Sequence, residues 1–326
     1  MIHVLITGGA GFIGSNYIRH ALASHSDWEI WNFDMLTYAG NLANLKDVEN
    51  DPRYHFVKGD ITDVVTVNEV MENGIDIVIN FAAESHVDRS IKGSQEFLMT
   101  GVLGVQTLLD AAKEGGVKLF YQISTDEVYG DVEVGQYSKE TDALRPSSPY
   151  SAAKAAGDLL VLAYARTHHV PVIISRCTNN YGPYQYPEKM LPLFVTNILE
   201  HKKVPVYGDG QQIRDWLHVD DHCRAIDLVV EKGIRGEVYN IGANHQSEWT
   251  NLQVTRLILD QLKASAEMIE FVEDRPGHDR RYAVDTTKIQ ALGWAPMVKP
   301  EEGLHSTIQW YTDHSEWWQP LKNRKI

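Results

Sequence analysis

One stretch near the middle of this 326-residue chain carries side chains that could act together in a reaction. Thr125 supplies a hydroxyl, and Asp126 and Glu127 supply two adjacent carboxyls. Tyr150 and Lys154 are four residues apart, which places a phenol and an amine on one face of a predicted helix. A tyrosine, with a pKa of about 10, is a poor base unless a nearby cation favours its phenolate. Together these groups could oxidise an alcohol and then eliminate water.

The two carboxyls directly follow an apolar run, Leu119–Ile123, which is typical of a buried strand. Adjacent side chains of a strand point to opposite faces, so the chain must turn here if Asp126 and Glu127 are to serve one substrate. An elimination needs one base and one acid, and like charges push the pKa values of neighbouring carboxyls apart. The structural alternative is that Asp126 caps a helix and Glu127 lies in its first turn, a role compatible with catalysis.

The N-terminal residues predict a dinucleotide-binding turn. Ile2–Thr7 reads as a strand, and it is followed by a glycine motif that includes Gly8, Gly11 and Gly14 and then by helical spacing. Such glycines let the backbone approach a pyrophosphate, whose charge the helix N-terminus meets. Asp34 ends the next predicted strand, where an acid binds the ribose and repels a 2′-phosphate, so NAD is predicted over NADP. The alternative is that Asp34 only opens a turn.

Strands and helices alternate from the N-terminus to residue 176. Further strands are predicted at 54–57, 75–80, 117–124 and 171–176, and further helices at 64–72, 95–114 and 150–168. This order predicts an α/β fold with a doubly wound parallel sheet, Rossmann-like, over residues 1–176. Residues 177–326 are predicted to form mainly a smaller α/β substrate-binding domain, with some segments between 215 and 245 returning to the first sheet. A Tyr–Lys pair alone could be a solvated surface pair, but here it follows a dinucleotide-binding pattern.

Composition narrows the class of partner. A formal charge of −14 argues against nucleic acid, and no apolar run approaches the roughly 20 residues that span a membrane. The chain opens directly on a strand, and Cys177 and Cys223 have no metal-ligand spacing, so a cytoplasmic protein is predicted. His218 and His222 flank two aspartates, but a metal site is not predicted because they straddle a strand end and a helix start.

Several motifs together resemble the dTDP-glucose 4,6-dehydratases of the extended short-chain dehydrogenase/reductase superfamily, over nearly the whole chain. Besides the glycine turn and the Tyr–Lys pair, the motifs are Leu36–Asn41, Ala82–Ser90, Ser124–Gly130, Asn179–Tyr184, Arg214–Trp216 and Arg275–His278. The resemblance implies a redox-neutral cycle in which Tyr150 takes the sugar 4-hydroxyl proton while NAD accepts the C4 hydride. Glu127 then removes the C5 proton, Asp126 protonates the leaving 6-hydroxyl, the hydride returns to C6, and a proton is restored at C5. Thr125 would hydrogen-bond the oxygen at C4.

The resemblance also implies the binding residues. For NAD they are Phe12, Ile13, Asp34, Thr37, Asp60, Ile61, Ala82, Ser85, Thr100, Tyr150, Lys154 and Asn180. For the nucleotide sugar they are Ser85, Asn179, Lys189, Tyr207, Arg214, Arg275 and His278. The planar forks of Arg214 and Arg275 suit a diphosphate, although either arginine could instead form a surface ion pair. A homodimer through the helices that begin near Gln95 and Tyr150 is implied by the resemblance alone.

Two positions depart from the family pattern. Gly101 stands where the family usually has asparagine, and the segment 241–250 is longer than the family's loop, so its nucleotide-contacting residue is not assigned. Other enzymes of the superfamily stay open as alternatives, namely a UDP-glucose 4,6-dehydratase, a 4-epimerase or a UDP-glucuronate decarboxylase. Asp126 favours a dehydratase, because an epimerase needs no acid and base at C5 and C6. A non-catalytic nucleotide-sensing protein is disfavoured by the full catalytic set. Thymine and uracil bases are not distinguished.

Overall fold

The computed structural model describes residues 1–243 and 248–324. Its main feature is a seven-stranded sheet with the order β10-β6-β5-β4-β1-β2-β3, in which every strand pair is parallel. The strands are β1 (Ile2–Thr7), β2 (Trp28–Asp34), β3 (Tyr54–Lys58), β4 (Ile77–Asn80), β5 (Leu119–Thr125), β6 (Val172–Cys177) and β10 (Val238–Ile241). The doubly wound α/β fold is confirmed, with the predicted strands of this sheet shifted by no more than two residues at their ends.

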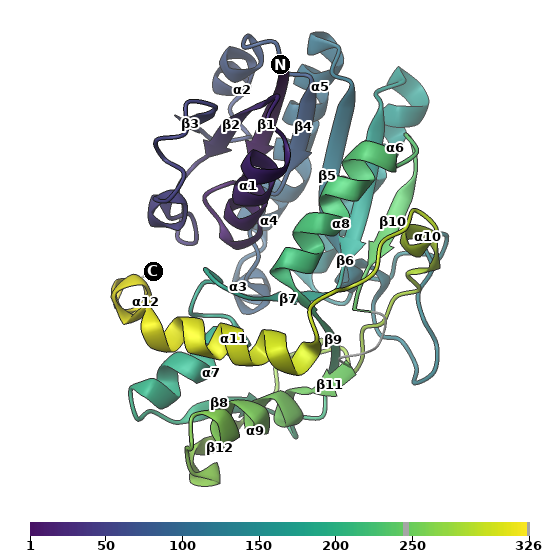
Figure 1. The fold of residues 1–326 in the computed structure, drawn as a ribbon. Helices are drawn as coiled ribbons and strands as arrows, with labels where there is room; N and C mark the ends of the chain where they lie inside the picture. The colour runs from purple at the N-terminus through teal and green to yellow at the C-terminus, as the bar shows by residue number, and fades with distance from the viewer. Residues whose placement is uncertain (244–247, 325–326) are drawn as a thin grey trace.

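Helices cover both faces of the large sheet (Figure 1). One face carries α1 (Phe12–Ser24) and α8 (Val219–Lys232), and the other carries α2 (Val64–Met71), α5 (Val105–Gly115) and α6 (Pro149–His168). Alternate residues of β1 belong to different cores, since Val4 and Ile6 pack with α1 and α8 while Leu5 packs on the opposite side. Burial of both faces explains why the strands read as unbroken apolar runs.

The winding of the sheet reverses between β1 and β4. Such a switch point leaves a crevice at the carboxyl ends of the strands, where ligands of this fold class bind. Gly8, directly after β1, has φ of +67°, and a Cβ there would lie 2.7 Å from the backbone nitrogen of Ala82, just beyond β4. Only glycine fits this close approach without strain.

Residues after β6 add two small sheets and a third core. The three-stranded sheet contains β7 (Asn179–Tyr181), β9 (Ile213–His218) and β11 (Glu248–Thr250), and the two-stranded sheet contains β8 (Val204–Tyr207) and β12 (Ile269–Val272). The helices beside them are α7 (Met190–Leu199), α9 (Asn251–Gln261), α11 (Pro300–Asp313) and α12 (Ser315–Lys322), which lie below the large sheet in Figure 1. This core is distinct from the two that flank the large sheet, and it includes the buried Trp216 and Trp318.

Residues 95–114, predicted as one helix, are interrupted. A short helix α4 (Gln95–Leu98) passes through a π-helical segment η2 (Met99–Gly104) into α5. Gly101 and Gly157 let η2 and α6 pack closely, since a Cβ on Gly157 would lie 2.6 Å from the carbonyl oxygen of Gly101. Gly101, where the family usually has asparagine, thus lies at a tight helix contact beside the pocket residue Thr100. Among the described residues, no helix has the length and apolar character needed to cross a membrane.

Candidate active site

One pocket opens at the carboxyl ends of β1, β4, β5 and β6. It is lined by every residue predicted to contact NAD and by all the predicted catalytic residues. These are Gly8, Gly11, Phe12, Ile13, Gly14, Asp34, Thr37, Asp60, Ile61, Ala82, Ser85, Thr100, Thr125, Asp126, Glu127, Tyr150, Lys154 and Asn180. The large sheet thus brings residues from the first 180 positions to one edge.

The dinucleotide end of this pocket has the donors that a pyrophosphate and a ribose need. Gly11 is the N-cap of α1, and no side chain caps this end of the helix, so its first N–H groups are left for an anion. Asp34 is held in place because its carboxylate accepts hydrogen bonds from the N–H groups of Ala10 at 2.9 Å and Leu36 at 2.7 Å. These groups fit NAD, and the carboxylate opposes a 2′-phosphate.

The two carboxyls lie on a turn. After Thr125 the chain enters a one-turn 3₁₀ helix, η3 (Asp126–Tyr129), as required for both acids to face one substrate. Thr125, rather than Asp126, is the cap: its hydroxyl accepts from the Glu127 N–H at 3.2 Å and donates to Asp126 Oδ1 at 3.1 Å. Asp126 Oδ2 is buried without a protein hydrogen bond among the described residues, so this oxygen is available to a bound group.

The environments of the two carboxyls differ. Burial, followed by the charge of Glu127, raises the pKa of Asp126 to about 8, so this carboxyl keeps its proton at neutral pH. Burial also raises the pKa of Glu127, but the positive charges of Arg275, Arg214 and Lys189 oppose the rise. Asp126 is thus suited to act as an acid, and the three positive side chains favour the ionised form of Glu127, which is the form that a base needs.

Tyr150 and Lys154 project from the first turns of α6. Burial, followed by the charge of Glu127, raises the pKa of Tyr150 well above its ordinary value, while a hydrogen bond with Thr125 opposes that rise. Lys154 donates from Nζ to the carbonyl oxygen of Ile123 at 2.7 Å rather than to Tyr150. Any support that Lys154 gives to the phenolate must therefore act through its charge.

The predicted substrate residues divide into two groups. Ser85, Asn179 and Lys189 line the pocket, and Lys189 Nζ donates to the Ser85 carbonyl oxygen. Tyr207, Arg214, Arg275 and His278 lie outside that lining.

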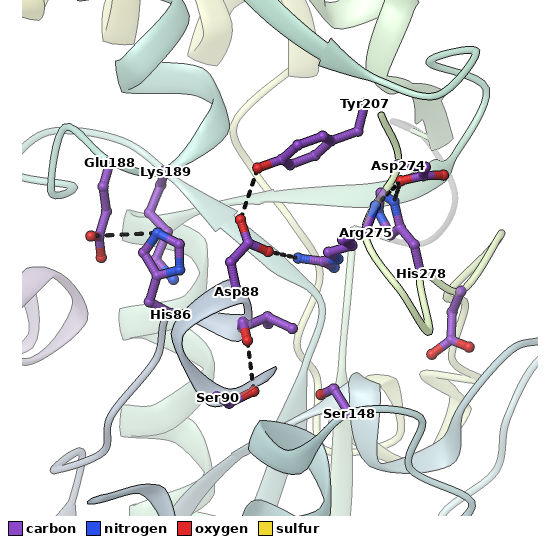
Figure 2. Close-up of polar contacts among 12 residues, drawn as sticks. His86, Asp88, Ser90, Ser148, Glu188, Lys189, Tyr207, Asp274, Arg275 and His278 are labelled. Carbon is purple, nitrogen blue, oxygen red and sulfur yellow. Dashed lines mark hydrogen bonds and ion pairs between the residues drawn. The ribbon is translucent and has the colours of Figure 1, made fainter. Parts of the chain in front are cut away.

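The residues of the second group contact one another or nearby acidic and aromatic side chains outside the pocket lining. Figure 2 shows Tyr207 and Arg275 pointing at Asp88, with Tyr207 donating to Oδ2 at 2.8 Å and Arg275 Nη1 3.4 Å from Oδ1. His278 pairs with Asp274 at 2.6 Å. Arg214 is buried, stacked over Tyr282 and bonded to backbone carbonyls.

Sequence reasoning missed several residues here. Asp88 was noted only as part of the Ala82–Ser90 motif, yet it is the side chain that joins two predicted substrate residues. Glu84, Cys177 and Glu188 also line the pocket. Glu84 belongs to the same motif, so motif membership was the available signal.

Other expectations concern metals and the nucleotide loop. His222 is buried and its Nδ1 lies 2.9 Å from Asn180 Oδ1, so it packs beside a pocket residue instead of pairing with His218. Within the described ranges, the one group with metal-ligand proximity is His25, Asp227 and Glu231, away from the pocket. Residues 244–247, in the segment expected to touch the nucleotide, lie outside the described residues.

Comparison with known proteins places the chain. The family described as GDP-mannose 4,6 dehydratase matches residues 5–307. The chain belongs to this family. Its relatives include the dTDP-glucose 4,6-dehydratase of Streptomyces niveus, 49% identical across 99% of this chain and 96% of that protein. The expected resemblance to the dTDP-glucose 4,6-dehydratases is confirmed over nearly the whole length.

Solved structures agree on the family fold. DesIV, a dTDP-glucose 4,6-dehydratase from Streptomyces venezuelae with NAD and TYD bound, has a TM-score of 0.95 and 48% identity, covering 98% of this chain and 100% of that chain. A UDP-glucuronic acid 4-epimerase from Bacillus cereus, bound to UDP-glucuronic acid and NAD, has a TM-score of 0.89 and 28% identity over 96% of this chain and 99% of that chain. The family fold is thus shared by enzymes with different chemistry.

Proposed function

We propose that the chain is an NAD-dependent dTDP-glucose 4,6-dehydratase, a hydro-lyase that converts dTDP-glucose to dTDP-4-keto-6-deoxyglucose and water. The observation that carries the proposal is the turn with Asp126 and Glu127 in the pocket of Tyr150 and Lys154. An alcohol oxidation alone would need only the last two residues. The adjacent acid and base account for an elimination, and relatives at about half identity with this chain are dTDP-glucose 4,6-dehydratases.

Each catalytic side chain has one task. Bound NAD supplies the acceptor for the C4 hydride and the hydride that later goes to C6. Tyr150 takes the proton of the sugar 4-hydroxyl, and Lys154 favours the phenolate through its charge. With C4 oxidised the C5 proton becomes acidic, Glu127 removes it, and Asp126 protonates the departing 6-hydroxyl, which leaves as water. Once the hydride has been added at C6, a proton is restored at C5. Thr125 hydrogen-bonds the oxygen at C4, where negative charge develops.

Binding is assigned to the two ends of the site. The NAD ligands are the pocket residues Gly8, Gly11, Phe12, Ile13, Gly14, Asp34, Thr37, Asp60, Ile61, Ala82, Ser85, Thr100, Tyr150, Lys154 and Asn180. The nucleotide-sugar ligands are Ser85, Asn179, Lys189, Tyr207, Arg214, Arg275 and His278. In this division residues 1–176, with β10, hold the cofactor, and residues 177–326 mainly hold the nucleotide sugar.

The first experiment is a substrate panel. Incubation with dTDP-, UDP-, CDP- and GDP-glucose, followed by alkali, should give the 4-keto chromophore most strongly with dTDP-glucose and no net NADH. Stronger product formation from UDP-glucose would show that the enzyme prefers a uracil nucleotide to a thymine nucleotide. A C4 epimer or carbon dioxide from UDP-glucuronate, with no keto product from any glucose nucleotide, would replace the dehydratase with an epimerase or a decarboxylase.

A variant tests the roles of the carboxyls. Glu127→Gln should still oxidise C4, because Tyr150 and Lys154 remain, but should not lose water. Enzyme-bound NADH and the unreduced 4-keto sugar should therefore accumulate, seen by absorbance and by mass spectrometry. Release of the 6-deoxy product at the parent rate would contradict the assignment of the base.

A homodimer and a cytoplasmic location belong to the same proposal. The support for the dimer is a group of exposed apolar side chains on α4, η2 and α6, namely Leu98, Met99, Leu103 and Leu159. Light scattering of the purified chain tests the first point, and cell fractionation tests the second.

A further inference from the structure

A buried ion pair lies behind the pocket. Asp158 on α6 and Arg176 on β6 are 0% and 2% exposed, and Arg176 Nε lies 2.9 Å from Asp158 Oδ2. Neither residue lines the pocket as described, and neither is among the assigned binding or catalytic residues. Replacing a buried ion pair by apolar residues is often neutral or stabilising, so stability alone does not account for this pair.

Asp158 lies on the same face of α6 as a second cation, Lys154. Tyr150, Lys154 and Asp158 are spaced by four residues along α6, which stacks them on one face of the helix. Lys154 is buried, and its Nζ reaches a neutral acceptor, the carbonyl oxygen of Ile123. Burial lowers the pKa of Lys154, and the charge of Asp158 is the largest influence opposing that change.

Arg176 connects the pair to the turn of the carboxyls. Its Nη1 donates to the hydroxyl of Tyr129 at 2.8 Å, and that hydroxyl donates to Asn240 Oδ1 at 2.8 Å. Tyr129 is the last residue of η3, which begins with Asp126 and Glu127. One continuous set of buried contacts therefore joins the helix of Tyr150 and Lys154 to the turn that carries the acid and the base.

We propose that Asp158 and Arg176 are positioning residues for both halves of the reaction. Asp158 holds Lys154 charged behind Tyr150 for hydride transfer, and Arg176, through Tyr129, fixes the turn used in elimination. This inference rests on the proposed function. Parent protein that makes no keto product from any nucleotide glucose refutes that function, whereas the experiments below judge the inference in an active parent.

The oxidation half of the reaction is studied in the Glu127→Gln variant, in which elimination is blocked. The rate of NADH formation from dTDP-glucose is measured as a function of pH. Adding Asp158→Asn should lower the plateau rate about ten-fold and move the alkaline limb to lower pH, because Lys154 loses its opposite charge. Adding Arg176→Gln removes a positive charge, so that Lys154 is the remaining cation paired with Asp158. The pKa of Lys154 should then rise, and the alkaline limb should move to higher pH.

The other groups near Lys154 do not produce these opposite shifts. Tyr150 on α6, Cys177 on β6 and Asp126 on η3 are the same in both variants, and burial raises the pKa of Cys177 to about 12. A merely structural role would lower the melting temperature and the rate without moving the limb. Superimposable profiles, or shifts of the same sign in both variants, would overturn the inference.

The elimination half is tested by Tyr129→Phe, which keeps every charge and removes only the hydroxyl. In the otherwise parent chain, NADH formation should keep its rate within about two-fold, while release of the 6-deoxy product slows about ten-fold. Tyr164→Phe is the matched control, since its hydroxyl donates to Asp110 away from the pocket. Equal behaviour of the two variants would overturn the inference, and this test decides it if Asp158→Asn does not fold.

Discussion

At the scale of single residues, the central feature is that two adjacent carboxyls have different surroundings. Asp126 is almost fully buried and bonded to Thr125, whereas the charges of Arg275, Arg214 and Lys189 act on Glu127. Neither difference is visible in the pair of letters. An acid and a base can thus stand side by side at neutral pH because their surroundings, and not their types, separate them.

The first prediction concerns pH. The pKa of Asp126 is raised to about 8, so its proton is present below that pH and is lost as pH rises through it. Elimination needs this proton, so product release should fall on the alkaline side with an apparent pKa of about 8, while NADH accumulates on the enzyme. Rapid-quench analysis from about pH 6 to about pH 10, a range that brackets this pKa, measures both the released product and the NADH on the enzyme. In Asp126→Asn the limb should disappear at a low residual rate, and an unchanged limb in that variant would contradict the prediction.

The second prediction concerns Asp88, which forms an ion pair with Arg275 and accepts a hydrogen bond from Tyr207 (Figure 2). A diphosphate approaching Arg275 meets this negative charge, so Asp88→Asn should tighten dTDP binding about five-fold at low salt. The difference should shrink at high salt, as measured by calorimetry. The matched control is Asp209→Asn, which removes a charge from an exposed pair with Arg280. Weaker dTDP binding in Asp88→Asn would instead make the aspartate a necessary support for Arg275.

At the scale of secondary-structure elements, close backbone contacts place the proposed catalytic groups. The contact of β1 with β4 depends on Gly8, and the contact of η2 with α6 depends on Gly101 and Gly157. The second contact places Thr100 of η2 beside the first turns of α6, where Tyr150 lies. A π-helical segment at such a point is common at functional sites.

The third prediction tests that helix contact. Gly157→Ala should lower the free energy of unfolding by about 1–3 kcal/mol, because the new methyl group meets the Gly101 carbonyl oxygen in a packed region. Urea denaturation measures this change, and NADH formation from dTDP-glucose should slow as α6 shifts. Gly93→Ala is the control, since nothing lies within 4 Å of its Cβ position. Equal free energies of unfolding of the two variants would show that η2 can move away from α6 without loss of stability.

At the scale of the whole molecule, the site lies between the large sheet with its two flanking cores and the third hydrophobic core. The large sheet with its two flanking cores presents the dinucleotide pocket and the carboxyls. The third core supports β8 and β9: β8 carries Tyr207, which donates to Asp88, and β9 carries Arg214, whose charge acts on Glu127. The positive charges of the second region therefore act on Glu127 although they are far from it in sequence.

The fourth prediction concerns assembly. Leu159 is 58% exposed on α6, a helix that contacts α4 and η2, so Leu159→Arg should place a charge in the proposed dimer interface. The variant should elute and scatter light as a monomer at micromolar concentration. Met297→Arg, at a residue 75% exposed elsewhere, should behave as the parent does. A parent chain that is itself monomeric would end the dimer proposal.

The sequence alone determined the large sheet, the cofactor turn and the family, because these depend on local signals. The strands of the large sheet are long apolar runs, and the glycine turn and the Tyr150/Lys154 spacing act over a few residues. The helix α7, which contains Pro192, and the short strands β7, β11 and β12 lacked such signals and went unpredicted.

Which groups share a charge environment follows from the tertiary structure and not from the order of residues. Asp88 meets Arg275 across 187 positions of sequence, and Arg176 meets Asp158 and Tyr129 from separate elements. The pKa of a carboxyl such as Asp126 depends on burial and on neighbours brought from distant segments, and no spacing along the chain encodes either quantity.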